Sequence, residues 1–480
     1  MIPGYFDEVF QSPNVARKVA AHLAEYLGQI SPEEMEVLNA KAELSMSNQG
    51  ITFTVYADER GTEKIFPLDL IPRILTHQEW APVEKGIVQR LKALNLFLRD
   101  VYNEQEILKD QVVPAHLVVQ SNQYCREMTG IKVPKGVHTH IGGVDLIRNE
   151  KGEFLVLEDN LRCPSGVSYM LNNRRILMRV LPKLFHQYKV RSVNHYPQIL
   201  FDQLTGLSKR ERPNIAVLTP GVYNSAYFEH AFLADQLGGE LVEGQDLLTD
   251  RDVLYRKTTR GLIRVDILYT RVDEAFIDPL VFRPDSYLGV PGLMHVYRAG
   301  NLVLANAPGN GVADDKAMYA YTPEIIKYYL NEEPILPIVK TYLCARADEL
   351  DYVLNNLEKL VVKPTDASGG YGLLVGSAAS EQQMAEFRVK LAQNPTGYIA
   401  QPIQKLSTHP TFVEQEGQWG FHPRHIDLRP YAVCGGESIE VIPGGLTRVA
   451  LRQGSLVVNS SQGGGSKDTW VLQEEEASPC

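Results

Sequence analysis

The chain has 480 residues and a net charge of -10, with 48 Lys and Arg against 58 Asp and Glu. Its 44% hydrophobic and 22% charged residues are typical of a soluble globular protein and exclude collagen-like or disordered classes. The acidic balance also disfavours nucleic acid as a partner. The length predicts roughly two to four packed units.

No apolar run approaches the length of about 20 residues that a membrane span needs, so we expect no membrane partner. The start, MIPGYFDEVFQS, lacks the basic and apolar regions of a signal peptide. The five cysteines form no C-x-x-C pair, which favours reduced thiols. We therefore expect a cytoplasmic protein.

Apolar residues recur every three or four positions in 14–45 and 83–110, which predicts that region 1–110 is mainly helical. Region 111–209 then contains two strand-like runs, VHTHIGGVDLIR and FLVLEDN, joined by the turn NEKG. Glu158 and Asn160 are two apart, so they share one face of their strand, and antiparallel pairing could bring Asp145 beside Glu158. Oxygen ligands of this kind suit Mg2+, although a solvated polar strand end explains the pattern equally well.

Region 210–312 follows a charged, Pro-containing linker and opens with a strand, a turn, a helix and a second strand. This order predicts a Rossmann-like unit, without the G-x-G-x-x-G of dinucleotide binding. Ligands in such units bind at strand carboxyl ends and helix amino ends. We therefore expect substrate contacts from Asn224, Ser225, Tyr227 and Glu229, with helix capping as the alternative role of Asn224 or Ser225.

Region 313–480 contains KLVVKPTDASGGYGLLVG, in which a buried strand ends at a lysine and a glycine-rich loop follows. Glycines let backbone N–H groups surround phosphate oxygens, so a phosphate clamp is predicted from Lys363, Ser368, Gly369, Gly370 and Gly372. A hairpin turn without a ligand is the alternative, since no Walker motif is present. Gln401 lies in the strand YIAQPI, whose backbone could bind an adenine edge.

Together these segments resemble the circularly permuted ATP-grasp family (type 2), distantly similar to the synthetase domain of glutathionylspermidine synthetase. The resemblance spans about residues 45–472, through FLVLEDNLRCPSGVSYML, NAPGNGVADDKA and LVVKPTDASGGYG. It implies a multi-lobed α/β (α+β) fold with a Rossmann-like pre-ATP-grasp unit and a helical N-terminal region. In this fold 313–480 supplies the nucleotide-binding lobes and 111–209 carries the metal-binding hairpin.

The resemblance also implies site residues and cofactors. ATP and Mg2+ are the cofactors, with Mg2+ held by Asp145, Glu158 and Asn160 and the ATP phosphates by Lys316 and Lys363. Gln401 corresponds to the adenine strand, and Ser165 lies where the relative has phosphate-contacting serines. That relative has an arginine two residues before the metal aspartate, where this chain has Gly143. Arg162 and Arg448 are our candidates for its role in stabilising a tetrahedral intermediate.

The predicted function is an ATP- and Mg2+-dependent carboxylate–amine ligase that works through an acyl phosphate and forms a peptide or amide bond. Its substrates would be a small-molecule or peptide carboxylate and an amine. A kinase-like phosphoryl transferase and a nucleotide-binding pseudoenzyme or scaffold remain as alternatives. Because this chemistry needs no protein nucleophile, Cys163 is interpreted as a packing thiol. His138 and His140, expected on one strand, are interpreted as structural.

Overall fold

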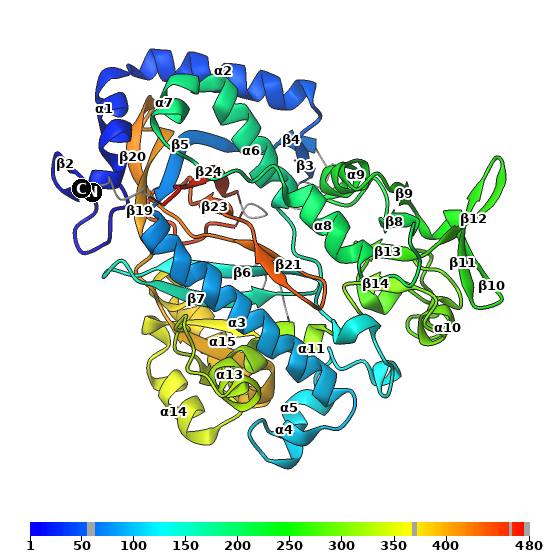
Figure 1. Cartoon of the computed structure of the whole chain (residues 1–480). Helices are drawn as coiled ribbons and strands as arrows, with labels where there is room; N and C mark the ends of the chain where they lie inside the picture. Colours follow the sequence, from blue (N-terminus) through cyan, green and yellow to red (C-terminus); the bar gives the residue numbers. More distant parts are fainter. Residues whose placement is uncertain (55–62, 367–371, 460–462, 475–480) are drawn as a thin grey trace, which may run out of the picture.

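The computed structural model describes residues 1–54, 63–366, 372–459 and 463–474 and has a mixed α/β fold with several sheets. In Figure 1 the N-terminal helices lie at the top, the Rossmann-like unit on the right and the helices of residues 322–393 in the lower part. Across these described ranges, no helix combines the length and apolarity needed to cross a membrane.

The N-terminal region contains both helices and strands. Its elements are β1 (Phe10–Ser12), β2 (Val15–Ala16), α1 (Ala21–Gln29), α2 (Pro32–Asn48), β3 (Thr52–Thr54), β4 (Glu63–Ile65), β5 (Leu68–Leu75), α3 (His77–Val101), α4 (Glu106–Lys109) and α5 (Ala115–Val119). Capping boxes begin α2 at Ser31 and α3 at Thr76. The expectation of a mainly helical region misses β5, which is almost wholly buried and pairs in parallel with β24 (Gly465–Val471).

The predicted hairpin is formed by β6 (Ile141–Arg148) and β7 (Phe154–Asn160), with Asp145 opposite Glu158 in the register. These strands join β21 (Tyr431–Cys434) and β22 (Ile439–Val441) in the order β22-β21-β6-β7. The helices α6 (Val167–Val180), α7 (Pro182–Gln187) and α8 (Tyr196–Thr205) follow.

Strand β6 begins only at Ile141, so the expectation that His138 and His140 lie on a strand is wrong. Both rings are buried, and their nitrogens have no hydrogen-bond partner among the described residues. Burial lowers the pKa of His138 to about 4 and that of His140 to about 3, which keeps both rings neutral at pH 7.

The Rossmann-like unit is a parallel sheet in the order β14-β13-β8-β9. Its elements are β8 (Ile215–Leu218), α9 (Tyr227–Gln236), β9 (Glu240–Val242), β13 (Ile267–Thr270), α10 (Leu293–Arg298) and β14 (Val303–Ala305), with an antiparallel sheet of β10 (Leu247–Asp250), β11 (Val253–Thr258) and β12 (Gly261–Val265). The predicted strand–helix–strand order is confirmed. Capping of the helix by Asn224 or Ser225 is not confirmed. Ala226 is the N-cap, and the Asn224 side chain closes the preceding turn by accepting a hydrogen bond from the Ala226 N–H at 2.9 Å.

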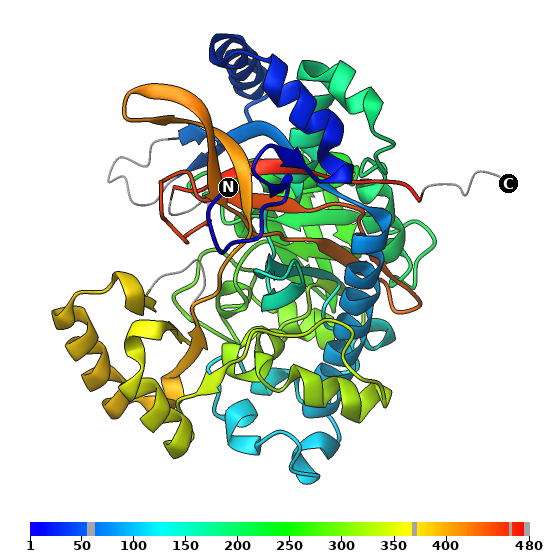
Figure 2. The same ribbon diagram turned by 90° about the vertical axis from the view of Figure 1, so that its left-hand side faces the viewer.

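Residues 342–402 form a lobe with an antiparallel sheet in the order β15-β18-β16-β17 and a small hydrophobic core of its own. The elements of residues 311–402 are α11 (Gly311–Asp314), α12 (Lys316–Tyr319), α13 (Thr322–Leu330), β15 (Tyr342–Leu343), α14 (Ala347–Asn355), β16 (Leu360–Pro364), β17 (Leu374–Val375), α15 (Glu381–Gln393) and β18 (Tyr398–Pro402). Figure 2 shows the lobe standing out at the lower left. The hairpin of β19 (Thr408–Gln415) and β20 (Gln418–His425) projects above it, and β23 (Leu446–Val449) lies beside β24.

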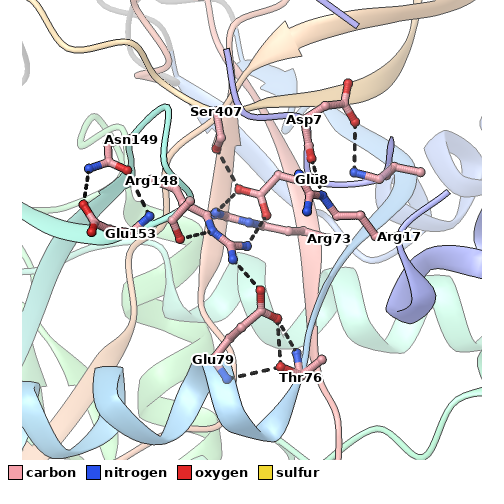
Figure 3. Close-up of polar contacts among 12 residues, drawn as sticks. Asp7, Glu8, Arg17, Arg73, Thr76, Glu79, Arg148, Asn149, Glu153 and Ser407 are labelled. Atoms are coloured by element: carbon pink, nitrogen blue, oxygen red, sulfur yellow. Dashed lines mark hydrogen bonds and ion pairs between the residues drawn. The ribbon is translucent and has the colours of Figure 1, made fainter. Parts of the chain in front are cut away.

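A buried ion-pair network ties the N-terminal segment to the central strands (Figure 3). The Glu8 carboxylate accepts hydrogen bonds from Arg73 at 2.6 Å, Arg148 at 2.9 Å and Ser407 at 2.7 Å. Burial opposes ionisation of Glu8, but the two arginine charges outweigh it and lower its pKa to about 2. Residues from three distant segments are therefore fixed around the Glu8 carboxylate.

Candidate active site

A pocket opens between the lobe of residues 342–402 and the central hairpin. Most of its wall is apolar, from residues of β16, β17 and the segments after β18 and β23: Val361, Leu373, Val375, Ile403, Leu406, Leu456, Val457 and Val458. Its charged lining is Glu158, Lys316, Lys363, Asp427 and Arg448. Such a pocket, mostly apolar with a few convergent charges, has the character of a small-molecule binding site.

Three cations meet in this pocket. Strand β16 carries Lys363 into it, and Lys316 begins α12 with its Nζ 3.8 Å from Glu158 Oε2. Burial lowers the pKa of Lys363, and the charges of Lys316 and Arg448 act in the same direction while Glu158 opposes them. A polyanion bound here would gain more electrostatic stabilisation than it would in water, because the surroundings are partly desolvated.

Gln401 lies on β18 in the same pocket and is 2% exposed. Its Nε2 donates to Thr341 Oγ1 at 3.0 Å, while its buried Oε1 has no partner among the described residues. A buried acceptor without a donor is costly, and a ligand amino group would satisfy it. Of the predicted glycine-rich clamp, Ser368, Gly369 and Gly370 lie outside the described residues. Gly372 follows with a φ of +72°, which favours glycine.

The predicted metal residues lie at the end of the hairpin. Asp145 is fully buried, and both its oxygens bind arginine: Arg429 at 2.5 and 2.8 Å and Arg448 at 2.7 Å. Burial disfavours the ionised form, but these two charges prevail and lower the pKa of Asp145. Glu158 faces the pocket, and the buried Nδ2 of Asn160 has no partner among the described residues.

This donor set fits Mg2+, which prefers oxygen and usually takes few protein ligands beside water and phosphate. Two opposed carboxylates and one amide are present, and the assignment of the amide oxygen and nitrogen of Asn160 can be exchanged. The described part of the chain contains no group of three or more His, Cys, Asp or Glu that could hold a metal by itself. Phosphate oxygens or waters would therefore have to complete the coordination.

Ser165 and Glu229 are held in internal contacts. Ser165 Oγ accepts a hydrogen bond from Arg271 at 2.5 Å, and its carbonyl accepts one from the Tyr431 hydroxyl at 2.9 Å. Glu229 is buried; it bonds to the backbone N–H groups of Gly166 and Ser168 at the start of α6 and pairs with Arg271 at 3.1 Å. The two residues thus lie in one buried cluster between the Rossmann-like unit and α6.

The remaining predicted residues lie at two places. Arg162 pairs with Asp314 at 2.8 Å and lines a small polar pocket that shares Glu158 and Lys316 with the larger one and also contains Asn160. Asn224, Ser225 and Tyr227 lie in and after the turn at the carboxyl end of β8, where they are partly buried.

Sequence reasoning missed three charged residues: Asp427, Arg429 and Arg271. Asp427 is buried against Arg448, and Arg271 is buried against Glu229. A signal was present for the first two, since HIDLRPY alternates polar and apolar residues as a strand does. No local signal marked Arg271, which follows the apolar strand β13.

The lobed α/β fold, with its antiparallel sheets and charged pocket, is that of the ATP-grasp class. The family model for circularly permuted ATP-grasp type 2 matches residues 72–450, and the chain belongs to this family. An uncharacterized protein of Synechocystis sp. is 53% identical over 98% of both chains. One from Mycobacterium tuberculosis is 48% identical, over 97% of this chain and 84% of that protein.

Two further comparisons bear on function and fold. A putative glutamate–cysteine ligase of Frankia alni is 39% identical over 98% of this chain, which spans only 54% of that protein. The apo structure of a glutathione synthetase-like effector from Globodera pallida aligns with a TM-score of 0.64, covering 92% of this chain and 98% of its own at 10% identity. That likeness concerns the fold alone.

Proposed function

We propose that the protein is an ATP- and Mg2+-dependent ligase that joins a carboxylate to an amine through an acyl phosphate. The observation that carries this proposal is the convergence of Lys316, Lys363 and Arg448 with Glu158 at one pocket that also has an apolar wall. Asp145 lies behind this lining, opposite Glu158 in the hairpin. The name of the Frankia relative supports a ligase. Because this chain spans about half of that protein, the name by itself does not say which half carries the activity.

In this proposal Gln401 and the apolar wall bind adenine, and Lys316, Lys363 and the glycine-rich loop bind the phosphates. Mg2+ held by Asp145, Glu158 and Asn160 would neutralise phosphate oxygens and orient them for transfer. Arg448 lines the larger pocket, and Arg162 lines the small pocket that shares Glu158 and Lys316 with it.

The reaction has two steps. A substrate carboxylate oxygen bonds to the γ-phosphorus and ADP leaves; the amine then attacks the acyl carbon, loses a proton to a base or water, and inorganic phosphate leaves. Arg448, Arg162 and Ser165 are proposed to stabilise the anionic species of these steps. Asn224, Ser225 and Tyr227 are proposed to contact the substrate from the Rossmann-like unit. Glu229 would act there indirectly, because its carboxylate is fully engaged.

The test is phosphate release from ATP and Mg2+ with a panel of carboxylates and amines, with product masses measured. We expect release that needs both an acid and an amine, and a product of their combined mass less one water. A phosphorylated acceptor formed without an amine would instead establish the kinase-like alternative. ADP binding without turnover across the panel would favour the scaffold.

A further inference from the structure

Three charged side chains form a row across the central sheet. The β21–β6 pairing joins Tyr431 to Gly143, and an isolated bridge joins Leu428 to Leu146, so Arg429 lies opposite Asp145. Asp145 in turn lies opposite Glu158 on β7. Cross-strand neighbours project from the same face of a sheet, which places a guanidinium directly beside the two carboxylates.

Gly143 provides the space that the arginine occupies. A Cβ at position 143 would lie 3.2 Å from Arg429 Cδ, 3.4 Å from its Cγ and 3.0 Å from Pro164 Cβ. The Arg429 side chain therefore crosses above Gly143 to reach Asp145. A longer side chain at position 143 would collide with Arg429, so glycine at this position leaves room for the guanidinium to reach Asp145.

Arg429 and Arg448 differ in how they are neutralised. Arg448 contacts Asp145 with Nη2 but is also bound by the buried carboxylate of Asp427 through Nε at 2.9 and 3.1 Å. Among the described residues, Asp145 is the single carboxylate that Arg429 contacts; its other bond goes to the Ser165 carbonyl at 3.3 Å. If Asp145 bound a metal cation instead of the arginines, Arg448 would still have Asp427 as its counter-ion, whereas Arg429 would lose Asp145, its own counter-ion.

Arg429 also has donors to spare. A guanidinium carries five N–H groups, and the contacts to Asp145 and Ser165 use three of them. Its side chain is 14% exposed, whereas Asp145 is fully buried. A planar, partly exposed guanidinium with unused N–H groups is well suited to bind a carboxylate or phosphate.

We propose that Arg429 is a reserve oxyanion-binding residue of this site, held by Asp145 until a divalent cation takes that carboxylate. This role rests on the proposed function. Mg2+ and Arg429 compete for Asp145, and when Mg2+ binds that carboxylate the guanidinium is released. The released guanidinium then binds the carboxylate or phosphate of the reacting group. Metal and oxyanion then bind with positive coupling, which is reciprocal by linkage.

The first experiment measures metal binding without nucleotide. Mn2+, which shares the preference of Mg2+ for oxygen ligands, is titrated into wild type and Arg429→Gln and followed by electron paramagnetic resonance. Removing the competitor should tighten Mn2+ binding by about tenfold. Asp145 keeps its contact with Arg448 in this variant. Equal affinities, or no binding to either protein, would contradict the proposal.

The second experiment measures inorganic phosphate binding by calorimetry in the presence of ADP, with and without Mg2+. Wild type should bind phosphate at least about tenfold more tightly with Mg2+, and Arg429→Gln should lose this gain while retaining ADP. Arg174→Gln is the matched control, because it also breaks a buried arginine–aspartate pair, with Asp468 at 2.7 Å, outside the pocket. It should behave like wild type; an Arg429→Gln variant that kept the full gain would overturn the proposal.

Gly143→Ala provides a second variant that changes no charge and displaces the Arg429 side chain by its Cβ. We expect it to lose most of the phosphate gain, even if Arg429→Gln folds poorly. If wild type failed to bind ADP, the proposed function would be contradicted. The Mn2+ titration contains no nucleotide, so it tests the role of Arg429 separately. Thermal unfolding of each variant checks that it is folded.

Discussion

The carboxylate of Glu229 accepts the backbone N–H of Ser168 at 3.0 Å, so a residue of α9 closes the amino end of α6. The same carboxylate bonds to Gly166 at 2.8 Å and to the Ser168 hydroxyl at 2.9 Å. A negative charge at a helix amino end is favourable, and here it also joins the Rossmann-like unit to the segment that carries Ser165.

Replacing Glu229 by glutamine removes this charge and leaves Arg271 buried without a counter-ion. We expect the free energy of unfolding to fall by about 3–5 kcal/mol, measured by urea denaturation. The control is Glu240→Gln, since Glu240 is 57% exposed in its pair with Arg256 and should change stability by less than about 1 kcal/mol. Equal effects of the two substitutions would refute a structural role for Glu229.

Lys363→Met should weaken ATP binding by about 10- to 100-fold, because it removes a charge-assisted contact to phosphate from a partly desolvated pocket. Calorimetric titration with ATP measures the change. Lys359→Met is the matched control: Lys359 is 69% exposed and precedes the same strand. If both variants bound ATP like wild type, Lys363 would have no place in the phosphate site.

Glu158→Gln should lower turnover by at least about 100-fold and raise the Mg2+ concentration needed for half-maximal activity, because an amide replaces a charged ligand. Phosphate release at varied Mg2+ measures both effects. Glu153→Gln changes an exposed glutamate of the same hairpin and should leave both quantities unchanged. An unaltered Mg2+ requirement in Glu158→Gln would remove this residue from the metal site.

Gly376→Ala should destabilise the lobe of residues 342–402. A Cβ there would lie 1.7 Å from the carbonyl oxygen of Leu357, a backbone atom that cannot move aside cheaply. We expect a loss of about 3 kcal/mol or more in unfolding free energy. Gly28→Ala in helix α1 meets nothing within 4 Å and should instead stabilise by up to about 1 kcal/mol. Urea denaturation, followed by circular dichroism, measures whether each substitution raises or lowers the free energy of unfolding.

Glu274 predicts a pH dependence of stability. Burial raises its pKa from 4.5 to about 7, although the Gly309 N–H opposes the shift. Between these values the folded state keeps a proton that the unfolded state has lost, so stability falls as pH rises from 4.5 to 7.

Glu274→Gln should remove this fall and gain up to about 3 kcal/mol at pH 8 relative to wild type, with little difference at pH 4. Unfolding midpoints from pH 4 to 8 measure it. Glu36→Gln changes an exposed glutamate and should keep the wild-type pH profile. A constant difference between Glu274→Gln and wild type at all pH values would show that titration of Glu274 is not the cause.

Local patterns predicted much of the fold. The pairing of Asp145 with Glu158 follows from a short turn and a two-residue period. The order of strand, turn and helix in the Rossmann-like unit could also be predicted from the sequence. In each case the interactions that fix the element join residues close in sequence.

The electrostatic partners could not be predicted in this way. Arg429 and Arg448 lie 284 and 303 residues from Asp145, and no spacing rule links positions so far apart. The same limit hid β5, whose parallel partner β24 comes near the end of the chain. Glu229 was selected for its place at a helix start, but its contacts depend on how two distant segments pack together.

The long separation between Asp145 and its two arginines has a consequence for synthesis. The ribosome releases the hairpin of β6 and β7 well before it makes Arg429 and Arg448, so a nascent chain holds Asp145 without the cations that neutralise it in the finished fold. A lone buried carboxylate is costly, and the central sheet still lacks β21 at that stage. Translation order therefore delays assembly of the pocket until Arg429 and Arg448 have emerged from the ribosome.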